Sequence, residues 1–217
     1  MGTEEMVEEM RIRLNRPEDD DLFEYPLDYY GALNRAHKYY RGKFVEHRPD
    51  LVYESATLQS SDGGDTFTLT DDHLGEMLLF RSPGPPNGRV MIPSNPEQNG
   101  HYWQEGRTLH MLTKYNGDLY VRWIPVTVTP LDQDTNSSLP AYCDEAIIER
   151  ACYLLAQKPG FLGNPDVYKN NANAFWRGEE DDPSDMGVLG VISRQSAFGS
   201  YEGSGDDANP WWRGIGS

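Results

Sequence analysis

The sequence predicts an α+β fold: a small helical bundle with an inserted antiparallel β domain and an extended C-terminal arm. Apolar residues recur every three or four positions over 27–46 and 140–157, which is the period of amphipathic helices. From 52 to 128 the pattern changes to alternating β-branched, aromatic and apolar residues, interrupted by turn-forming segments. A chain of 217 residues is long enough for one core with an insert.

The charge balance restricts the function. A formal charge of −16 disfavours a protein that grips nucleic-acid phosphates or an anionic membrane, because either needs a basic surface. The first 15 residues lack the apolar core of a signal peptide, and no later run approaches the ~20 apolar residues that span a bilayer. We therefore expect synthesis and residence in a cytoplasm-like compartment.

Residues 1–21 are predicted to form an acidic, flexible leader. Acidic residues occur at positions 4, 5, 8 and 9 and again at 18–21, and we expect this stretch to order only on contact with a partner. It has few apolar residues to bury.

The helical bundle is assigned to residues 22–51 and 131–177. Its first helix, over 27–46, ends before a proline, and the residues of its apolar face recur every three or four positions. These are Leu27, Tyr30, Leu33, His37, Tyr40 and Phe44. Its other face is basic and is interpreted as solvated, with a docking surface as the alternative. The basic residues are Arg35, Lys38, Arg41 and Lys43.

The inserted β domain is assigned to residues 52–130. Glu105-Gly106 and Asn116-Gly117 predict tight reversals, so 109–112 should pair with 119–124 across the second of them. Two prolines, Pro125 and Pro130, end the last strand. A polar linker then leads back to the bundle.

The helix over 140–157 is expected to organise the core, with Pro140 in its first turn and Ser137 or Ser138 as its cap. Its two apolar stripes should pack against Leu33, Tyr40 and Phe44. Glu149, Arg150 and Gln157 are left for the wet or partner-facing side. The expected stripe residues are Ile147, Ile148, Ala151, Leu154 and Leu155. Cys143 and Cys152 lie on opposite sides of this helix and are interpreted as buried thiols without a disulfide.

A further helix is predicted over 165–176, where Asn164 provides a cap and a proline follows it. Beyond it, residues 178–217 are assigned to the extended arm. The arm has a Gly-rich lead and ends in Trp211, Trp212 and Arg213, whose composition suits an interface anchor on a neighbouring subunit. The alternative is a tail whose tryptophans fold back on their own subunit.

No catalytic, metal or cofactor motif is found in the sequence, so neither an enzyme activity nor a cofactor is predicted. A calcium site among Asp62, Asp65, Asp71, Asp72 and His73 is interpreted instead as loop solvation, and His101 and His110 as polar surface. The acid pair Glu179 and Glu180 lies in a solvated stretch unsuited to glycoside hydrolysis. Five aromatic residues in the β region fit a core better than a sugar-stacking face. These are Tyr102, Trp103, Tyr115, Tyr120 and Trp123.

The order of elements resembles that of the head-to-tail adaptor (connector) proteins of tailed bacteriophages. The resemblance covers roughly residues 22–177 and depends on the hairpin YWQEGRTLHMLTKYNGDLYVRWIP, the following Leu-Pro and the helix AYCDEAIIERACYLLAQ. In that family a helical bundle carries a β domain. The chain departs from it after the organising helix, since Gly178 and an acidic run end a helix that is commonly longer in the family.

The resemblance implies a structural virion protein at the head-tail junction, made in the host cytoplasm and without catalysis. A ring of copies, commonly twelve, would dock on the portal protein, continue the DNA channel and receive the tail or a tail-completion protein. The acidic composition fits a channel through which genome DNA passes without specific binding. The alternative is a virion carbohydrate-binding or glycan-hydrolysing protein that uses the aromatic β region.

Overall fold

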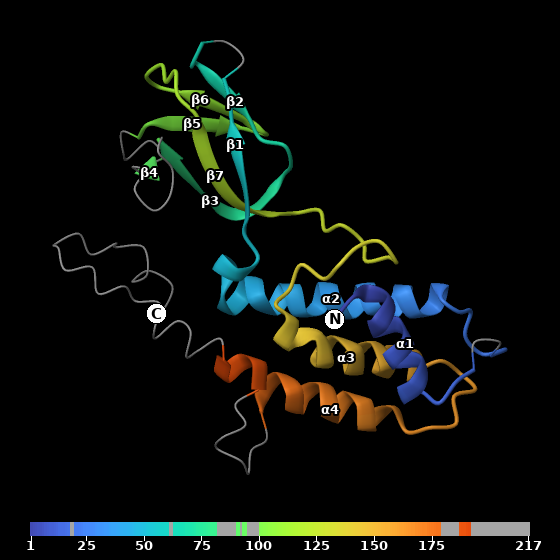
Figure 1. Cartoon of the computed structure of the whole chain (residues 1–217). Coiled ribbons are helices and arrows are strands. Elements are labelled where there is room, and N and C mark those ends of the chain that lie inside the picture. The colour runs from blue at the N-terminus through green and yellow to red at the C-terminus, as the bar shows by residue number, and fades with distance from the viewer. Residues whose placement is uncertain are drawn as a thin grey trace.

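The computed structural model describes residues 1–17, 20–60, 63–81, 90–91, 93–94, 100–178 and 187–191. The predicted α+β class is confirmed: helices pack together into a bundle, and a β module carrying two small antiparallel sheets stands over one end of it (Figure 1). The β module, residues 54–125, is inserted between the second and third helices of the bundle.

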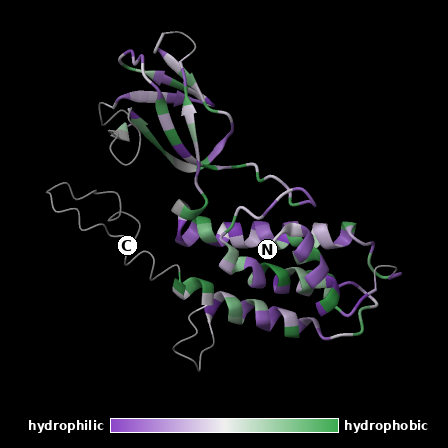
Figure 2. Ribbon diagram, viewed as in Figure 1, coloured by the Kyte–Doolittle hydropathy of each residue, from purple (hydrophilic) through white to green (hydrophobic). Residues whose placement is uncertain are grey.

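Within the described residues, α3 lies in the middle of the bundle and packs against three other helices. Hydrophobic and hydrophilic residues are interspersed along the helices, as expected of amphipathic elements (Figure 2). The α-helices are α1 (Thr3–Arg13), α2 (Leu27–His47), α3 (Asp144–Ala156) and α4 (Pro165–Arg177), with short 3-10 helices η1 (Pro49–Leu51) and η2 (Ala141–Cys143).

Helix α1 overturns the prediction of a flexible leader. Met6 and Met10 are fully buried and Val7 is nearly so, because α1 lies along α3 and completes the core. Of the glutamates on α1, Glu4 and Glu5 are exposed, and the half-buried Glu8 and Glu9 pair with arginines of the same helix. Burial of three apolar side chains, worth about 1.5–3 kcal/mol each, outweighs the acidity of the segment.

Helix α2 follows its predicted range and buries Leu33, Tyr40 and Phe44 as expected. Two positions differ from the sequence interpretation. Leu27, expected on the apolar face, is 63% exposed, and Arg41, expected on the basic outer face, is buried. The basic face therefore consists of the exposed Arg35 and Lys38 and the half-buried Lys43.

Helix α3 begins later than predicted. Pro140 precedes the 3-10 turn η2, and the α-helix starts at Asp144 without a side-chain cap. Ile147, Ile148, Ala151 and Leu155 are buried against the bundle, whereas Leu154 is only partly buried. Glu149, assigned to the wet or partner-facing side, is also buried, because α1 covers this side of α3.

Helix α4 has the predicted start. The Asn164 side chain accepts a hydrogen bond from the Asp166 backbone N–H at 3.1 Å, and a proline occupies the first turn. Trp176 packs against Tyr40 and Phe44 of α2, with ring centroids 5.2 and 5.8 Å apart. These aromatic contacts seat α4 on the same core.

The β module has two sheets around one apolar cluster. In the described residues, one sheet has the strand order β1-β7-β3-β4 and the other β2-β6-β5, and every strand pair is antiparallel. The strands are β1 (Glu54–Leu58), β2 (Thr66–Thr68), β3 (His73–Arg81), β4 (Val90–Met91), β5 (Tyr102–Glu105), β6 (Thr108–Met111) and β7 (Leu119–Pro125).

The first predicted reversal is correct, since β5 and β6 pair across Gly106, whose φ of 56° suits glycine. The predicted pairing across Asn116-Gly117 is wrong. Strand β6 pairs with β2 and β5, whereas β7 lies between β1 and β3 in the other sheet. Residues 112–118 thus cross between sheets, held where the Tyr115 N–H donates to the Gly64 carbonyl at 2.9 Å.

The bundle and the β module have separate hydrophobic cores. Ile124, near the end of β7, belongs to the bundle core, whereas Trp123 belongs to the β module. Glu54 pairs with Trp123 in the β1–β7 ladder, so the chain enters and leaves the module at adjacent points. The boundary between the two parts falls at this pair.

The C-terminal arm is described only in part. Residues 187–191 form a short helix, and Val188 is buried in the bundle core. This short segment therefore folds on its own subunit and not as part of an arm. The proposed anchor residues Trp211, Trp212 and Arg213 lie outside the described residues.

Candidate functional site

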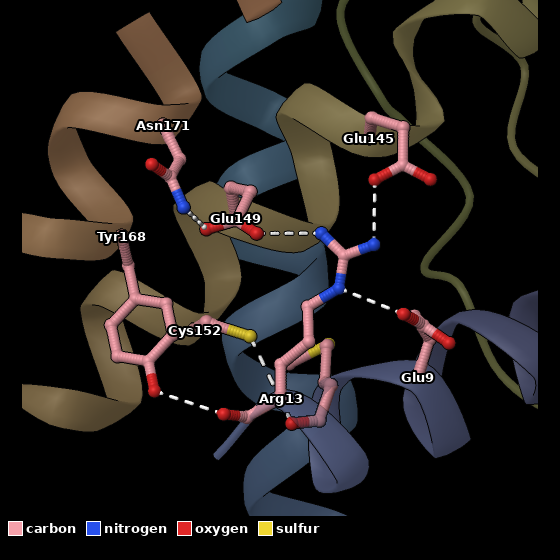
Figure 3. Close-up of polar contacts among 8 residues, drawn as sticks. Glu9, Arg13, Glu145, Glu149, Cys152, Tyr168 and Asn171 are labelled. Carbon is pink, nitrogen blue, oxygen red and sulfur yellow. Dashed lines mark hydrogen bonds and ion pairs between the residues drawn. The ribbon is translucent and has the colours of Figure 1, made fainter.

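A charged cluster joins three helices at the side of the bundle (Figure 3). The guanidinium of Arg13, near the end of α1, donates from Nε to Glu9 at 2.9 Å, from Nη2 to Glu145 at 2.7 Å and from Nη1 to Glu149 at 2.6 Å. Glu9 lies one turn earlier on α1, and the other two acids lie on successive turns of α3. One cation therefore ties α1 to α3.

The cluster continues into α4. The second carboxylate oxygen of Glu149 accepts from Asn171 Nδ2 at 3.2 Å, and the hydroxyl of Tyr168 donates to the backbone carbonyl of Arg13 at 3.0 Å (Figure 3). Glu149 is 5% exposed, so both of its oxygens need partners inside the protein. Arg13 and Asn171 supply them.

Burial opposes the charge on Arg13, but its hydrogen bonds to three carboxylates outweigh burial and hold the pKa of the guanidinium above its ordinary value. Nearby, Cys152 directs its thiol to the Met10 carbonyl at 3.9 Å. Burial raises the pKa of the Cys152 thiol, and burial followed by the charge of Asp144 raises the pKa of Cys143 to about 12. Both cysteines are free, buried thiols as predicted, and neither forms a reactive thiolate at neutral pH.

A second polar group lies where α2 meets the β module. Arg41 donates from Nη2 to the carbonyl of Pro125 at 2.7 Å, and His37 Nε2 lies 3.4 Å from Ser138 Oγ. His37 is 1% exposed. Burial and then the charge of Arg41 lower the pKa of His37 to about 4, so its ring is neutral at pH 7.

The aromatic residues of the β module are divided between its core and its surface. Tyr102 and Trp123 are buried, and Tyr115 packs partly against the same core. Trp103 is 42% exposed and stacks on His110, with ring centroids 3.9 Å apart and planes 6° apart. Tyr120 is half-buried, so Trp103 is the one exposed ring among the five aromatic residues singled out in the sequence.

The acidic residues weighed as calcium ligands have other partners. Asp72 pairs with Arg107 at 2.9 Å, and Asp65 pairs with Lys114 at 2.9 Å. Within the described ranges, no group of three or more His, Cys, Asp or Glu side chains is arranged to hold a metal ion. Asp62, Glu179 and Glu180 fall outside the described residues.

Sequence reasoning identified the core residues but missed both polar clusters. Arg13 and Glu149 are 136 positions apart, so no local spacing indicates that they meet. The accessible signal was the helical stripe Met6, Val7 and Met10 inside the acidic N-terminal run, which places Glu9 and Arg13 on a shared face of a helix.

In the part of the chain that the structure describes, no helix is long and apolar enough to cross a bilayer. No protein-family model matches the sequence, and a comparison with curated proteins finds no match. Arguments about function therefore depend on the residues and their arrangement.

Proposed function

We propose that this chain is the subunit of a head-to-tail adaptor ring in a tailed bacteriophage: a structural, non-enzymatic virion protein. The observation that carries the proposal is the arrangement of the elements. A helical bundle is interrupted between α2 and α3 by a β module that stands over one end of it, and this is the order that the resemblance to adaptor proteins implies (Figure 1).

The packing of the bundle supports a structural role. The Arg13 cluster holds three helices together, with the guanidinium bound by three carboxylates, and both thiols are buried. Side chains fixed in this way are suited to a rigid building block and not to a reacting site. The formal charge of −16 is also compatible with a channel past which DNA slides without adhering.

In this proposal the copies form a homo-oligomeric ring at the head-tail junction, commonly of twelve subunits. The ring binds the portal protein on one side and the tail or a tail-completion protein on the other. It is assembled in the host cytoplasm and contains neither cofactor nor membrane segment.

The test is to mix the purified protein with portal-bearing heads and image the particles by cryo-electron microscopy, with sedimentation of the free protein beside it. A ring of density at the portal vertex is the expected result. Heads that lack any added ring at saturating protein contradict the proposal. Retention of a 24.6 kDa monomer on a glycan column, lost on changing the exposed Trp103 to alanine, would favour the carbohydrate-binding alternative instead.

A further inference from the structure

A cleft of about 270 Å³ lies at the junction between the bundle and the β module. One wall is α2, another is the start of β1, and the third is the segment that returns from β7 to η2, which runs over α2 in Figure 1. Arg41 and His37 line the cleft from α2, and Ser138, Thr127 and Thr129 line it from the return segment. The lining is polar and carries hydroxyl groups.

The half-buried Arg13 and the buried Arg41 have very different surroundings. Arg13 is bound by three carboxylates, whereas Arg41 is 7% exposed and makes one hydrogen bond, to a neutral carbonyl, within the part of the chain that the structure describes. A guanidinium has five N–H donors, and one of those of Arg41 has an acceptor among the described contacts. The described Arg41 nitrogens that lack an acceptor are not sealed from solvent, so they are open to a ligand on the side where Arg41 lines the cleft. A cation with so little exposure is stabilised by a negative charge bonded to it.

The nearest acidic group does not fill this role. Glu54, at the start of β1, attracts Arg41 through space, but its side chain is exposed on the rim and forms no hydrogen bond with the guanidinium among the described contacts. His37 cannot act as a counter-charge, because an imidazole is either neutral or cationic, and this ring is neutral at pH 7. The charged residues among the described lining are therefore the buried Arg41 and the exposed Glu54.

We propose that the cleft binds a compact oxyanion, either a phosphate group or a carboxylate group, against the guanidinium of Arg41. The planar fork of arginine matches both groups. Ser138 and the two threonines offer hydroxyl donors around the bound oxygens. This inference concerns a ligand site and does not depend on the adaptor assignment.

The first experiment is calorimetric titration of the full chain with sodium phosphate and, separately, with sodium acetate. Ionic strength is held constant with sodium chloride, since salt screens charge interactions. Saturable binding of either anion at one site per chain is expected, and the anion that binds identifies the group recognised. Failure of both anions to bind overturns the proposal.

Two substitutions on α2 test whether the anion binds at Arg41. Arg41→Gln should abolish binding, whereas the control Arg35→Gln, a change of an exposed arginine on the same helix, should leave the dissociation constant within twofold. Binding that survives in Arg41→Gln, with the fold intact by circular dichroism, contradicts the proposal.

Glu54→Gln keeps the test decisive if Arg41→Gln does not fold. Removing a carboxylate from the rim ends its repulsion of the anion and should tighten binding about twofold to fivefold, as expected for one charge near a solvated surface. Unchanged or weaker binding in Glu54→Gln would show that the anion does not enter this cleft.

Discussion

Glu149 shows how strongly the surroundings of one residue depend on distant parts of the chain. On α3 alone it faces outward, and the sequence assigns it to the wet or partner-facing side. Helix α1 covers it, so that the carboxylate is 5% exposed and bonded to both Arg13 and Asn171. Its charge is tolerated only because these partners are present.

Arg13→Met tests this dependence. The change leaves the buried Glu149 carboxylate without its cation, so the free energy of unfolding should fall by about 3–5 kcal/mol, as for other broken buried pairs. Urea denaturation followed by circular dichroism measures it. Arg35→Met, at an exposed position on α2, is the control and should change stability by less than about 0.5 kcal/mol. A loss below about 1 kcal/mol in Arg13→Met would mean that Glu149 reaches water.

His37 should make stability depend on pH between about 4 and 6.5. Its pKa is about 4 in the folded chain against an ordinary 6.5, so in this interval the unfolded chain binds a proton that the folded chain does not. The contribution of neutral His37 to the free energy of unfolding is fully present above pH 6.5. It is lost as the pH drops towards 4, which lowers the free energy of unfolding by up to about 3 kcal/mol. Urea titrations at pH 7 and pH 4.5 measure the fall.

The matched variant His37→Gln removes this titration but keeps a polar side chain. Its loss of stability between pH 7 and pH 4.5 should be smaller than that of the parent by about 2–3 kcal/mol. Equal losses in the two proteins would show that His37 is already protonated in the folded state.

At the scale of helices and strands, hydrophobic periodicity predicted the bounds of helices, which depend on local sequence. Helices α2 and α4 begin and end within a residue of the expected bounds, because their apolar repeats and the Asn164 cap are local signals. Strand partners were not predictable in the same way. Asn116-Gly117 is a strong hairpin signal, yet β7 pairs with β1 and β3, which lie well before it in the chain. A local turn signal does not include such distant partners.

Helix α1 was missed for a related reason. Counting charges over residues 1–21 suggested disorder, but an apolar stripe three residues long is enough when α3 provides the opposing surface. The cleft beside Arg41 was also beyond local reasoning, because its walls come from segments about 85–100 residues apart in the chain. The composition of a segment carries no information about which distant elements pack against it in the folded chain.

Two substitutions on α3 separate its buried side from its half-buried side. Ile147→Ala should lower the free energy of unfolding by about 2–5 kcal/mol, because Ile147 is fully buried and the change leaves a cavity. Leu154→Ala, at a partly buried position, should cost clearly less, about 1 kcal/mol. Thermal or urea unfolding of both proteins measures the difference, and equal losses would contradict the burial pattern of this helix.

At the scale of the whole molecule, there are two hydrophobic cores, one in the bundle and one in the β module. Among the described residues the two cores have no buried residue in common, and the chain crosses between them beside the Glu54–Trp123 pair. The junction is held by Arg41 and by Ile124, whose side chain belongs to the bundle.

Excision of the module tests this independence. Replacing residues 55–122 with a short Gly/Ser linker keeps Ile124 and Pro125, and the bundle should remain helical and unfold cooperatively. Circular dichroism and a urea titration are sufficient measurements. A chain that loses its helical signal would show that the bundle needs the β module in order to fold.

The position of the β module also imposes an order of events on the ribosome. Helices α1 and α2 emerge first, but α3, which covers the apolar faces of both, is separated from α2 by roughly a hundred residues of β module and linker. At a translation rate of about 5–20 residues per second, the apolar faces of α1 and α2 remain uncovered for roughly 5–20 seconds before α3 is synthesised. During that interval Met6, Met10 and Leu33 are available to chaperones or to nascent neighbours on the same polysome.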